Sequence, residues 1–272
     1  MTAPKQDSKL DPNSFYDDND PVLSDDAIAI LTQYSGVPQA DLIPHVRAIR
    51  DAAFKLFPYP CIGQYNFMSL SIAKDPQYPS ILSRVQRGET LLDLACCFGQ
   101  DLRKLVFDGA PSTNLTGFEL EQGFLDGGYD LFDDRDTFDA RMIAGDFFSP
   151  SAVELGLEEG GYDMLHAASF YHLFSRAEQV EALTKSLRLL KPQPGSMVFG
   201  RQSGVEKPGV LKHPATRSGE MYRHDVESWQ TLMEEVVAGA GVRAVCECEG
   251  YESGNTQMAG VYGLMRFCLR LM

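Results

Sequence analysis

Short apolar runs alternate with amphipathic segments between residues 90 and 200. Five of the runs have the length and composition of strands buried on both faces, at residues 91–94, 115–119, 142–147, 162–167 and 195–200. Between the first two runs, Leu102, Leu105 and Val106 recur at helical spacing, and Gly109 is suited to end that helix. Alternating strands and helices require parallel strands joined by right-handed crossovers. The pattern therefore predicts an α/β fold.

Helical patterns precede this region. Ser24 is a suitable N-cap for a helix ending at Gly36, and a second helix is expected over residues 39–57, stopped by Pro58. Shorter helical pieces at residues 66–74 and 78–86 lead into the first strand. We therefore expect a disordered polar tail at residues 1–13, a helical cap or lid at 14–87 that shapes the substrate pocket, and a core at 88–272.

The pattern after the fifth strand is more irregular. Glycine and proline are frequent from residue 205 to 216, which predicts a mobile loop. An amphipathic helix is expected at residues 225–238, with Trp229, Leu232 and Met233 on its inner face. Two further strands are expected at residues 242–249 and 261–269.

The loop after the first strand carries small residues at every second position, namely Ala95, Cys97 and Gly99. Small residues let the backbone approach a ligand closely. A dinucleotide fingerprint would need more glycines, and Asp93 in the strand would repel phosphates. Asp93 suits a ligand with a cationic amino group, such as the methionine part of S-adenosylmethionine. The alternative interpretation is an ordinary buried turn.

Polar residues follow the other strands as well. Glu119 ends the second strand, where a carboxylate accepts hydrogen bonds from ribose hydroxyls. Asp146 ends the third strand, placed to accept from an adenine amino group with Phe147 against the ring. His166 lies in the fourth. Ligands of open α/β sheets bind at this edge, so the set favours an adenosine-containing cofactor.

Four stretches together carry a resemblance to a known family, at residues 58–63, 92–105, 108–111 and 200–202. The chain resembles class I S-adenosylmethionine-dependent methyltransferases from about residue 15 to 267. It looks most like a fungal secondary-metabolism group that includes the carboxyl O-methyltransferases of meroterpenoid pathways. Ala95 replaces the first motif glycine, and Glu119 stands where many relatives carry aspartate.

The resemblance implies a Rossmann-like, seven-stranded, mostly parallel sheet with an antiparallel C-terminal strand and an N-terminal helical cap. It implies S-adenosyl-L-methionine as the cofactor and no metal. The residues expected to bind the cofactor are Tyr16, Asp93, Ala95, Cys97, Gly99, Gln100, Glu119, Leu120, Asp146, Phe147 and His166. Tyr16 is predicted either to fold over the cofactor as a lid or to anchor the tail to the core.

Composition excludes several other classes of protein. The 272 residues carry a formal net charge of −14, which argues against nucleic acid as a partner. No apolar run is long enough to span a bilayer and the N-terminus lacks a signal-like apolar segment, so a cytoplasmic protein is expected. The six cysteines have neither metal nor disulfide spacing, and reduced thiols are expected. A homodimer is left open.

The catalytic residues that the chain needs depend on the acceptor. A carboxylate is already ionised at neutral pH, whereas a phenol gains from a base. His166, His172 and His224 are the candidate bases, and Arg201 is a candidate for holding a substrate carboxylate. His166 also has an alternative place beside the cofactor. Each histidine has a structural alternative, and Arg201 has a salt bridge as its alternative.

The sequence favours O-methylation of a carboxylate on an apolar polyketide or meroterpenoid acid. A phenol or alcohol acceptor is the first alternative, and a cyclase, pericyclase or binding module that retains the cofactor is the second. Six aromatic residues are expected to wall the acceptor pocket or to pack in the core: Phe57, Tyr59, Phe67, Phe170, Tyr171 and Phe174. An NAD-dependent oxidoreductase is disfavoured by the missing glycines.

Overall fold

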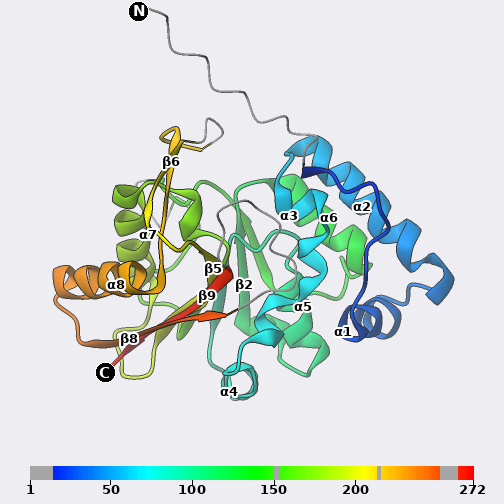
Figure 1. Ribbon diagram of the computed structural model, residues 1–272. Coiled ribbons are helices and arrows are strands. Elements are labelled where there is room, and N and C mark those ends of the chain that lie inside the picture. Colours follow the sequence, from blue (N-terminus) through cyan, green and yellow to red (C-terminus); the bar gives the residue numbers. More distant parts are fainter. Residues whose placement is uncertain (1–14, 150–153, 213–215, 252–262) are drawn as a thin grey trace, which may run out of the picture.

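A computed structural model describes residues 15–149, 154–212, 216–251 and 263–272. Its main sheet has the strand order β3-β2-β1-β4-β5-β9-β8 (Figure 1). The bounds of these strands are Arg141–Ala144 for β3, Leu115–Glu119 for β2, Leu91–Leu94 for β1, Met164–Ala168 for β4, Met197–Gly204 for β5, Gly263–Leu271 for β9 and Ala244–Tyr251 for β8. The first five are parallel, and β9 is antiparallel to both of its neighbours. The predicted seven-stranded, mostly parallel sheet is confirmed.

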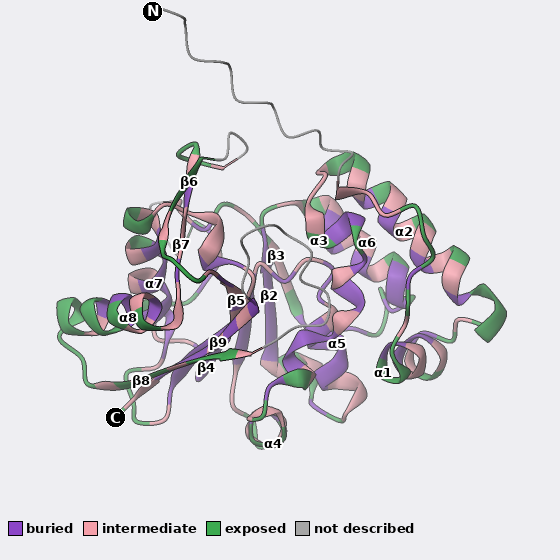
Figure 2. Cartoon of the chain, in the orientation of Figure 1, coloured by how far each residue is buried: buried purple, intermediate pink, exposed green. Residues whose placement is uncertain are grey.

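Helices cover both faces of this sheet (Figures 1 and 2). On one face Leu92 and Leu94 pack with α7 (Arg176–Leu189) and α8 (Val226–Ala240). On the other face Leu91 packs with α4 (Tyr78–Gln86) and α5 (Gln100–Phe107). Because successive side chains of a strand point to opposite faces, β1 has leucines facing both layers of helices, with Asp93 as its one polar residue. The helix α6 (Gln122–Phe132) connects β2 to β3.

The N-terminal helices form a separate layer against α6. They comprise α1 (Asp25–Ala29), the π-helical turn η2 (Ile30–Tyr34), η3 (Gln39–Asp41), α2 (Leu42–Leu56), α3 (Pro60–Gly63), η4 (Asn66–Ser69) and η5 (Ser71–Lys74). Ser24 caps α1 by accepting a hydrogen bond from the Ala27 N–H, as predicted. The apolar faces of these helices share one cluster with Phe98, Phe124 and Phe132. This layer therefore packs directly on the loop that follows β1.

The predicted mobile loop at residues 205–216 is a strand over four of its twelve residues, and residues 213–215 lie outside the described ones. Strand β6 (Gly209–Lys212) begins there and pairs antiparallel with β7 (Glu220–Arg223) as a separate two-stranded ribbon. The ribbon is held to the core because the Tyr222 N–H donates to the Phe174 carbonyl, at the end of η7 (Tyr171–Leu173). The glycine and proline content did not reveal a ribbon whose position depends on this distant contact.

Smaller differences concern strand ends and the chain beyond the described residues. Strand β3 ends at Ala144 and not at residue 147, and β4 begins at Met164 and not at residue 162. The tail at residues 1–13 and the predicted strand start at residue 261 lie outside the described residues. Within the described ranges, no helix has the length and hydropathy needed to cross a membrane. All six cysteines are free thiols.

Candidate active site

The loop between β1 and α5 has an unusual backbone. Ala95, Cys97 and Gly99 all have positive φ, at 58°, 54° and 64°. Only glycine adopts this left-handed conformation without a steric penalty. The small residues that the sequence placed at every second position therefore stand where the backbone turns, and two of the three carry a Cβ that the turn disfavours.

Replacing Ala95 with glycine should relieve this strain. Left-handed backbone costs a non-glycine residue about 1–2 kcal/mol, partly offset by the larger unfolded-state entropy of glycine. We expect Ala95→Gly to raise the free energy of unfolding by about 0.5–1 kcal/mol, measured by urea denaturation. Ala167→Gly, in the buried strand β4, is the control and should lower it by about 1 kcal/mol. A loss of stability in both variants would contradict backbone strain at Ala95.

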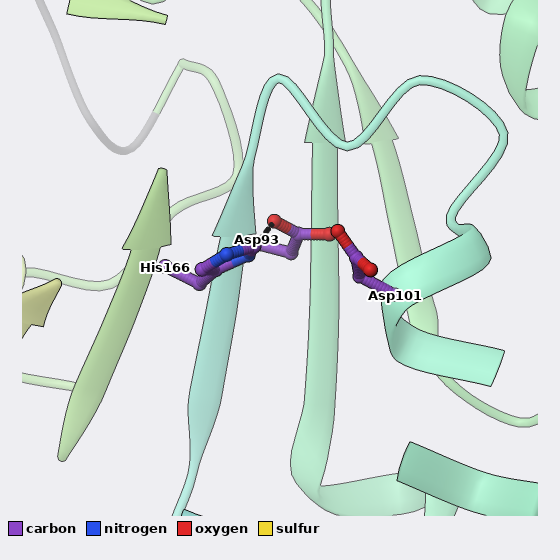
Figure 3. Close-up of side chains that lie close together, drawn as sticks. All are labelled: Asp93, Asp101 and His166. Carbon is purple, nitrogen blue, oxygen red and sulfur yellow. Dashed lines mark hydrogen bonds and ion pairs between the residues drawn. The ribbon is translucent and has the colours of Figure 1, made fainter. Parts of the chain in front are cut away.

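Asp93 lies within β1 and not at its end, and it faces His166 across the β1–β4 pair (Figure 3). The Asp93 Oδ1 and His166 Nδ1 atoms are 2.7 Å apart, and both residues are 2 % exposed. Burial raises the pKa of Asp93. Although burial opposes the charged imidazolium, the Asp93 carboxylate raises the pKa of His166. The two residues therefore form one buried pair that shares a proton.

Asp101, at the start of α5, completes a buried polar cluster with this pair. Ligand atoms of Asp93, Asp101 and His166 all lie within 4.8 Å of one another. The Asp101 carboxylate already accepts hydrogen bonds from Ser71 Oγ at 2.6 Å and from the Ile72 N–H at 3.1 Å. Within the cluster Asp93 Oδ2 is buried without a partner. One open carboxylate oxygen fits a cationic hydrogen-bond donor better than a metal ion, which takes several ligands at once.

Glu119 ends β2 beside the same loop and is 7 % exposed. Its Oε2 accepts a hydrogen bond from the Cys97 N–H and its Oε1 from the Leu120 N–H, each at 2.8 Å. Burial raises the pKa of Glu119, and these backbone donors oppose the rise. After burial, the Glu119 carboxylate is the largest cause of the raised pKa of Tyr59. The segment before α3 therefore lies beside the end of β2.

Asp146 and Phe147, the two residues predicted to contact the adenine, differ in their exposure to solvent. The Phe147 ring is 3 % exposed and packs edge-on against Phe118 and Phe170, so it presents no free face here. The Asp146 carboxylate is half exposed and bonds Arg217 of the segment before β7 at 2.9 Å. Leu120 is 52 % exposed. Of the predicted adenine contacts, Asp146 is open to solvent and the Phe147 ring lies in the core.

Tyr16 is fixed to the cap helix α2. Its hydroxyl donates to Asp51 Oδ1 at 2.8 Å, and the Arg50 guanidinium lies 3.8 Å from its ring centroid. A cavity of about 430 Å³ beside it is lined by Tyr16, Asp18, Asp51, Phe54 and Lys55. These contacts match the anchoring role that the sequence left as the alternative to a lid.

Arg201 and His172 lie near the carboxyl end of β4, since Arg201 is opposite Ala168, the last residue of β4, and His172 is in η7, which follows β4 in the chain. Arg201 Nη1 is 3.4 Å from Ser169 Oγ, and Ser169 has a positive φ of 60°. His172 Nδ1 is buried without a partner, and burial, then Arg223 and Arg201, hold the pKa of His172 well below its ordinary value. A small cavity of about 10 Å³ is lined in part by Arg201, by Tyr251 and by His166 of the buried pair. Arg201 and His172 therefore lie together, and His172 is neutral.

His224 does not face this region. Its Nε2 is 2.8 Å from Gln179 Oε1 and its Nδ1 is 2.9 Å from Ser228 Oγ. Gln179 uses its amide nitrogen for the carbonyls of Phe174 and Tyr222, so His224 Nε2 carries the proton and donates. These contacts do not fit the prediction of His224 as a base, because one ring nitrogen is bound to Gln179 of α7 and the other to Ser228 of α8.

Comparison with known proteins identifies the chain as a methyltransferase. Residues 15–68 match the family described as the meroterpenoid methyltransferase N-terminal domain. The chain is 42 % identical to O-methyltransferase phiE from Fungal sp. over 85 % of this chain and 78 % of that protein. It is 38 % identical to the Asnovolin E/Chermesin D methyltransferase nvfJ from Aspergillus novofumigatus, over 89 % and 87 %. The chain therefore belongs to this family of fungal methyltransferases.

Solved structures share the fold at low sequence identity. A Haloferax volcanii methyltransferase, solved with its Trm112 activator, matches with a TM-score of 0.54 at 17 % identity over 82 % of this chain and 97 % of that one. The 1,6-didemethyltoxoflavin-N1-methyltransferase of Burkholderia thailandensis matches with a TM-score of 0.55 at 14 % identity, over 84 % and 90 %. The second was solved with S-adenosylhomocysteine bound. These matches confirm the fold, and S-adenosyl-L-methionine stays the predicted cofactor.

The residues present fit that cofactor. Two buried acceptors without partners, Asp93 Oδ2 and Gln100 Oε1, lie at the two ends of the loop after β1 and suit a cationic amino group. Glu119 lies beside the loop and suits the ribose. Asp101, which the sequence reasoning missed, supports the cluster. An acid in the first turn of a helix is ordinary, so its sequence carried no distinct signal.

Glu119→Ala should weaken S-adenosylmethionine binding by about 1–3 kcal/mol, because the ribose hydroxyls and the Cys97 N–H lose their acceptor. Calorimetric titration with S-adenosylmethionine and S-adenosylhomocysteine measures it. Glu121→Ala removes the adjacent carboxylate and serves as the control, with affinity expected to stay within about twofold. Unchanged affinity in Glu119→Ala would refute the ribose assignment.

Proposed function

We propose that this enzyme is an O-methyltransferase of secondary metabolism that methylates a carboxylate of an apolar aromatic acid of the polyketide or meroterpenoid class. The observation that carries the proposal is Arg201, a half-buried residue of β5 that lies opposite the last residue of β4 and has no carboxylate partner among the described residues. The chain carries 38 acidic residues and only 24 basic ones, so acidic partners are plentiful. An unpaired guanidinium beside the cofactor site suits a substrate carboxylate.

When bound, the cofactor supplies a methyl group on a positively charged sulfonium. A carboxylate with a pKa of about 4 is ionised at neutral pH and needs no base. The task of Arg201 is then to hold one carboxylate oxygen and orient the other toward the reacting methyl group. Positioning of the nucleophile and exclusion of water account for most of the catalysis expected in such a displacement.

The aromatic residues divide between the core and the surface of the pocket. Phe67, Phe170 and Tyr171 are buried in the core, at 2 %, 6 % and 0 % exposure. Phe57 and Tyr59 are half-buried, with ring centroids 4.1 Å apart, in the segment that lies beside Glu119. This pair is the apolar wall that we propose for the acceptor. The match of residues 15–68 to the meroterpenoid methyltransferase N-terminal domain supports this class.

A phenol acceptor is the second candidate, because the neutral His172 has a buried Nδ1 without a partner. For a carboxylate acceptor, His172→Ala should slow turnover by less than about tenfold. A loss of about 10³-fold would show a general base and favour a phenol. Mass spectrometry of reactions with a panel of aromatic acids and phenols, in wild type and variant, distinguishes the two. The homodimer and the cytoplasmic location remain predictions.

A further inference from the structure

A second guanidinium, like that of Arg201, lowers the pKa of His172. Arg223, at the end of β7, is half-buried and donates from Nη1 to Ser203 Oγ and from Nη2 to Met221 Sδ. Ser203 follows Arg201 by two residues in β5, so both side chains point to the same face of the sheet with origins about 7 Å apart. The β6–β7 ribbon therefore places Arg223 on the face of β5 that carries Arg201.

Arg223 lacks the compensation that the other buried arginines have. Arg50 and Arg103, which are 1 % and 0 % exposed, each bond an aspartate. Among the described residues, Arg223 and Arg201 have no carboxylate partner. His172, which lies near both, is neutral and does not offset their charge. Burial lowers the pKa of Arg223. Two guanidiniums near one neutral histidine, each partly buried and without an anion, destabilise the free protein, since burial of an unpaired charge is costly.

We propose that Arg223 and Arg201 together bind the carboxylate of the acceptor, so that the β6–β7 ribbon forms one wall of the acceptor site. This inference rests on the proposed carboxylate acceptor and adds a specificity residue to it. Two guanidiniums from different elements can donate hydrogen bonds to both oxygens of one carboxylate. They disfavour neutral analogues of the acid, such as its amide. Arg223 contacts the substrate in this arrangement, and its Ser203 bond fixes its direction.

The test uses the whole protein loaded with S-adenosylhomocysteine and titrated by calorimetry with naphthoate and with its neutral amide, naphthamide. Wild type should bind the acid more tightly, and Arg223→Gln should weaken acid binding by about 10–100-fold with little change for the amide. Affinity for S-adenosylhomocysteine should stay within about twofold. Lys212→Gln, exposed on β6, removes one positive charge from the same ribbon and should leave acid binding unchanged.

A second measurement needs no ligand. If the role of Arg223 is to bind an anion, Arg223→Met should raise the thermal midpoint of the free protein by about 2–4 °C, because an unpaired buried charge is removed. A lower midpoint would overturn the proposal, since the guanidinium would then stabilise the fold. Equal binding of acid and amide by wild type would refute the carboxylate acceptor itself. Acid preference lost in Arg201→Lys but intact in Arg223→Gln would keep that acceptor and refute only the role of Arg223.

Discussion

Replacing Arg103 with methionine should lower the free energy of unfolding by about 3–5 kcal/mol. Arg103 is fully buried in α5, where its Nε and Nη2 bond both oxygens of Asp134 at 2.7 and 2.9 Å. Its Nη1 donates to the Phe98 carbonyl at 2.7 Å. The variant would leave Asp134, which is 4 % exposed, with the hydroxyl of Tyr34 as its remaining side-chain partner in the described chain. A buried carboxylate left without its cation accounts for most of the loss.

Urea denaturation measures this change. Arg135→Met is the matched control, because Arg135 and Asp126 form a half-exposed pair at 3.8 Å that should contribute less than about 1 kcal/mol. The double variant Arg103→Met with Asp134→Leu should be less destabilised than the sum of the two single changes, since it leaves no unpaired charge. Equal costs for Arg103→Met and Arg135→Met would contradict the argument.

The same arginine connects the cap to the loop after β1. Tyr34 of η2 donates to Asp134 Oδ2 at 2.7 Å, and Asp134 holds Arg103, which bonds the Phe98 carbonyl between Cys97 and Gly99. Burial raises the pKa of Tyr34, and the bond to Asp134 raises it further. The hydroxyl therefore stays protonated and keeps this bond across the physiological range.

The second large effect is loss of stability in acid through His224. Burial, then Arg176, lowers the pKa of His224 from 6.5 to about 4. The unfolded chain therefore binds more protons than the folded chain between these pH values, so stability rises with pH across this window. The contribution is fully present above pH 6.5 and is lost as the pH falls toward 4. Its size is about 3 kcal/mol.

His224→Gln tests this prediction, because glutamine keeps a polar side chain but does not titrate. The variant should lose stability at pH 7, where His224 joins Gln179 and Ser228, yet its free energy of unfolding should fall less steeply from pH 6.5 to 4. Urea denaturation at a series of pH values gives both slopes. Parallel pH profiles for the two proteins would show that His224 is protonated as readily in the fold as in the unfolded chain.

The sequence by itself determined the elements and the chemistry along the sheet edge. Leu91, Leu92 and Leu94 are apolar because β1 is covered on both faces, and this pattern can be recognised in the sequence alone. Small residues at Ala95 and Cys97 mark the two strained turns of the loop. Acids near strand ends predicted an adenosine cofactor, because parallel strands bring their carboxyl ends to one edge.

The tertiary structure decided which polar groups meet. Asp93 and His166 are 73 residues apart, and the β1–β4 register makes them a pair. His224 matched a base in the sequence but is bound on both nitrogens, whereas Arg223 carried no sequence signal and lies beside Ser203. The physical reason is that local periodicity reports how much of an element is buried. It does not report which distant element buries it, and that choice sets the partners and charge of every side chain in the site.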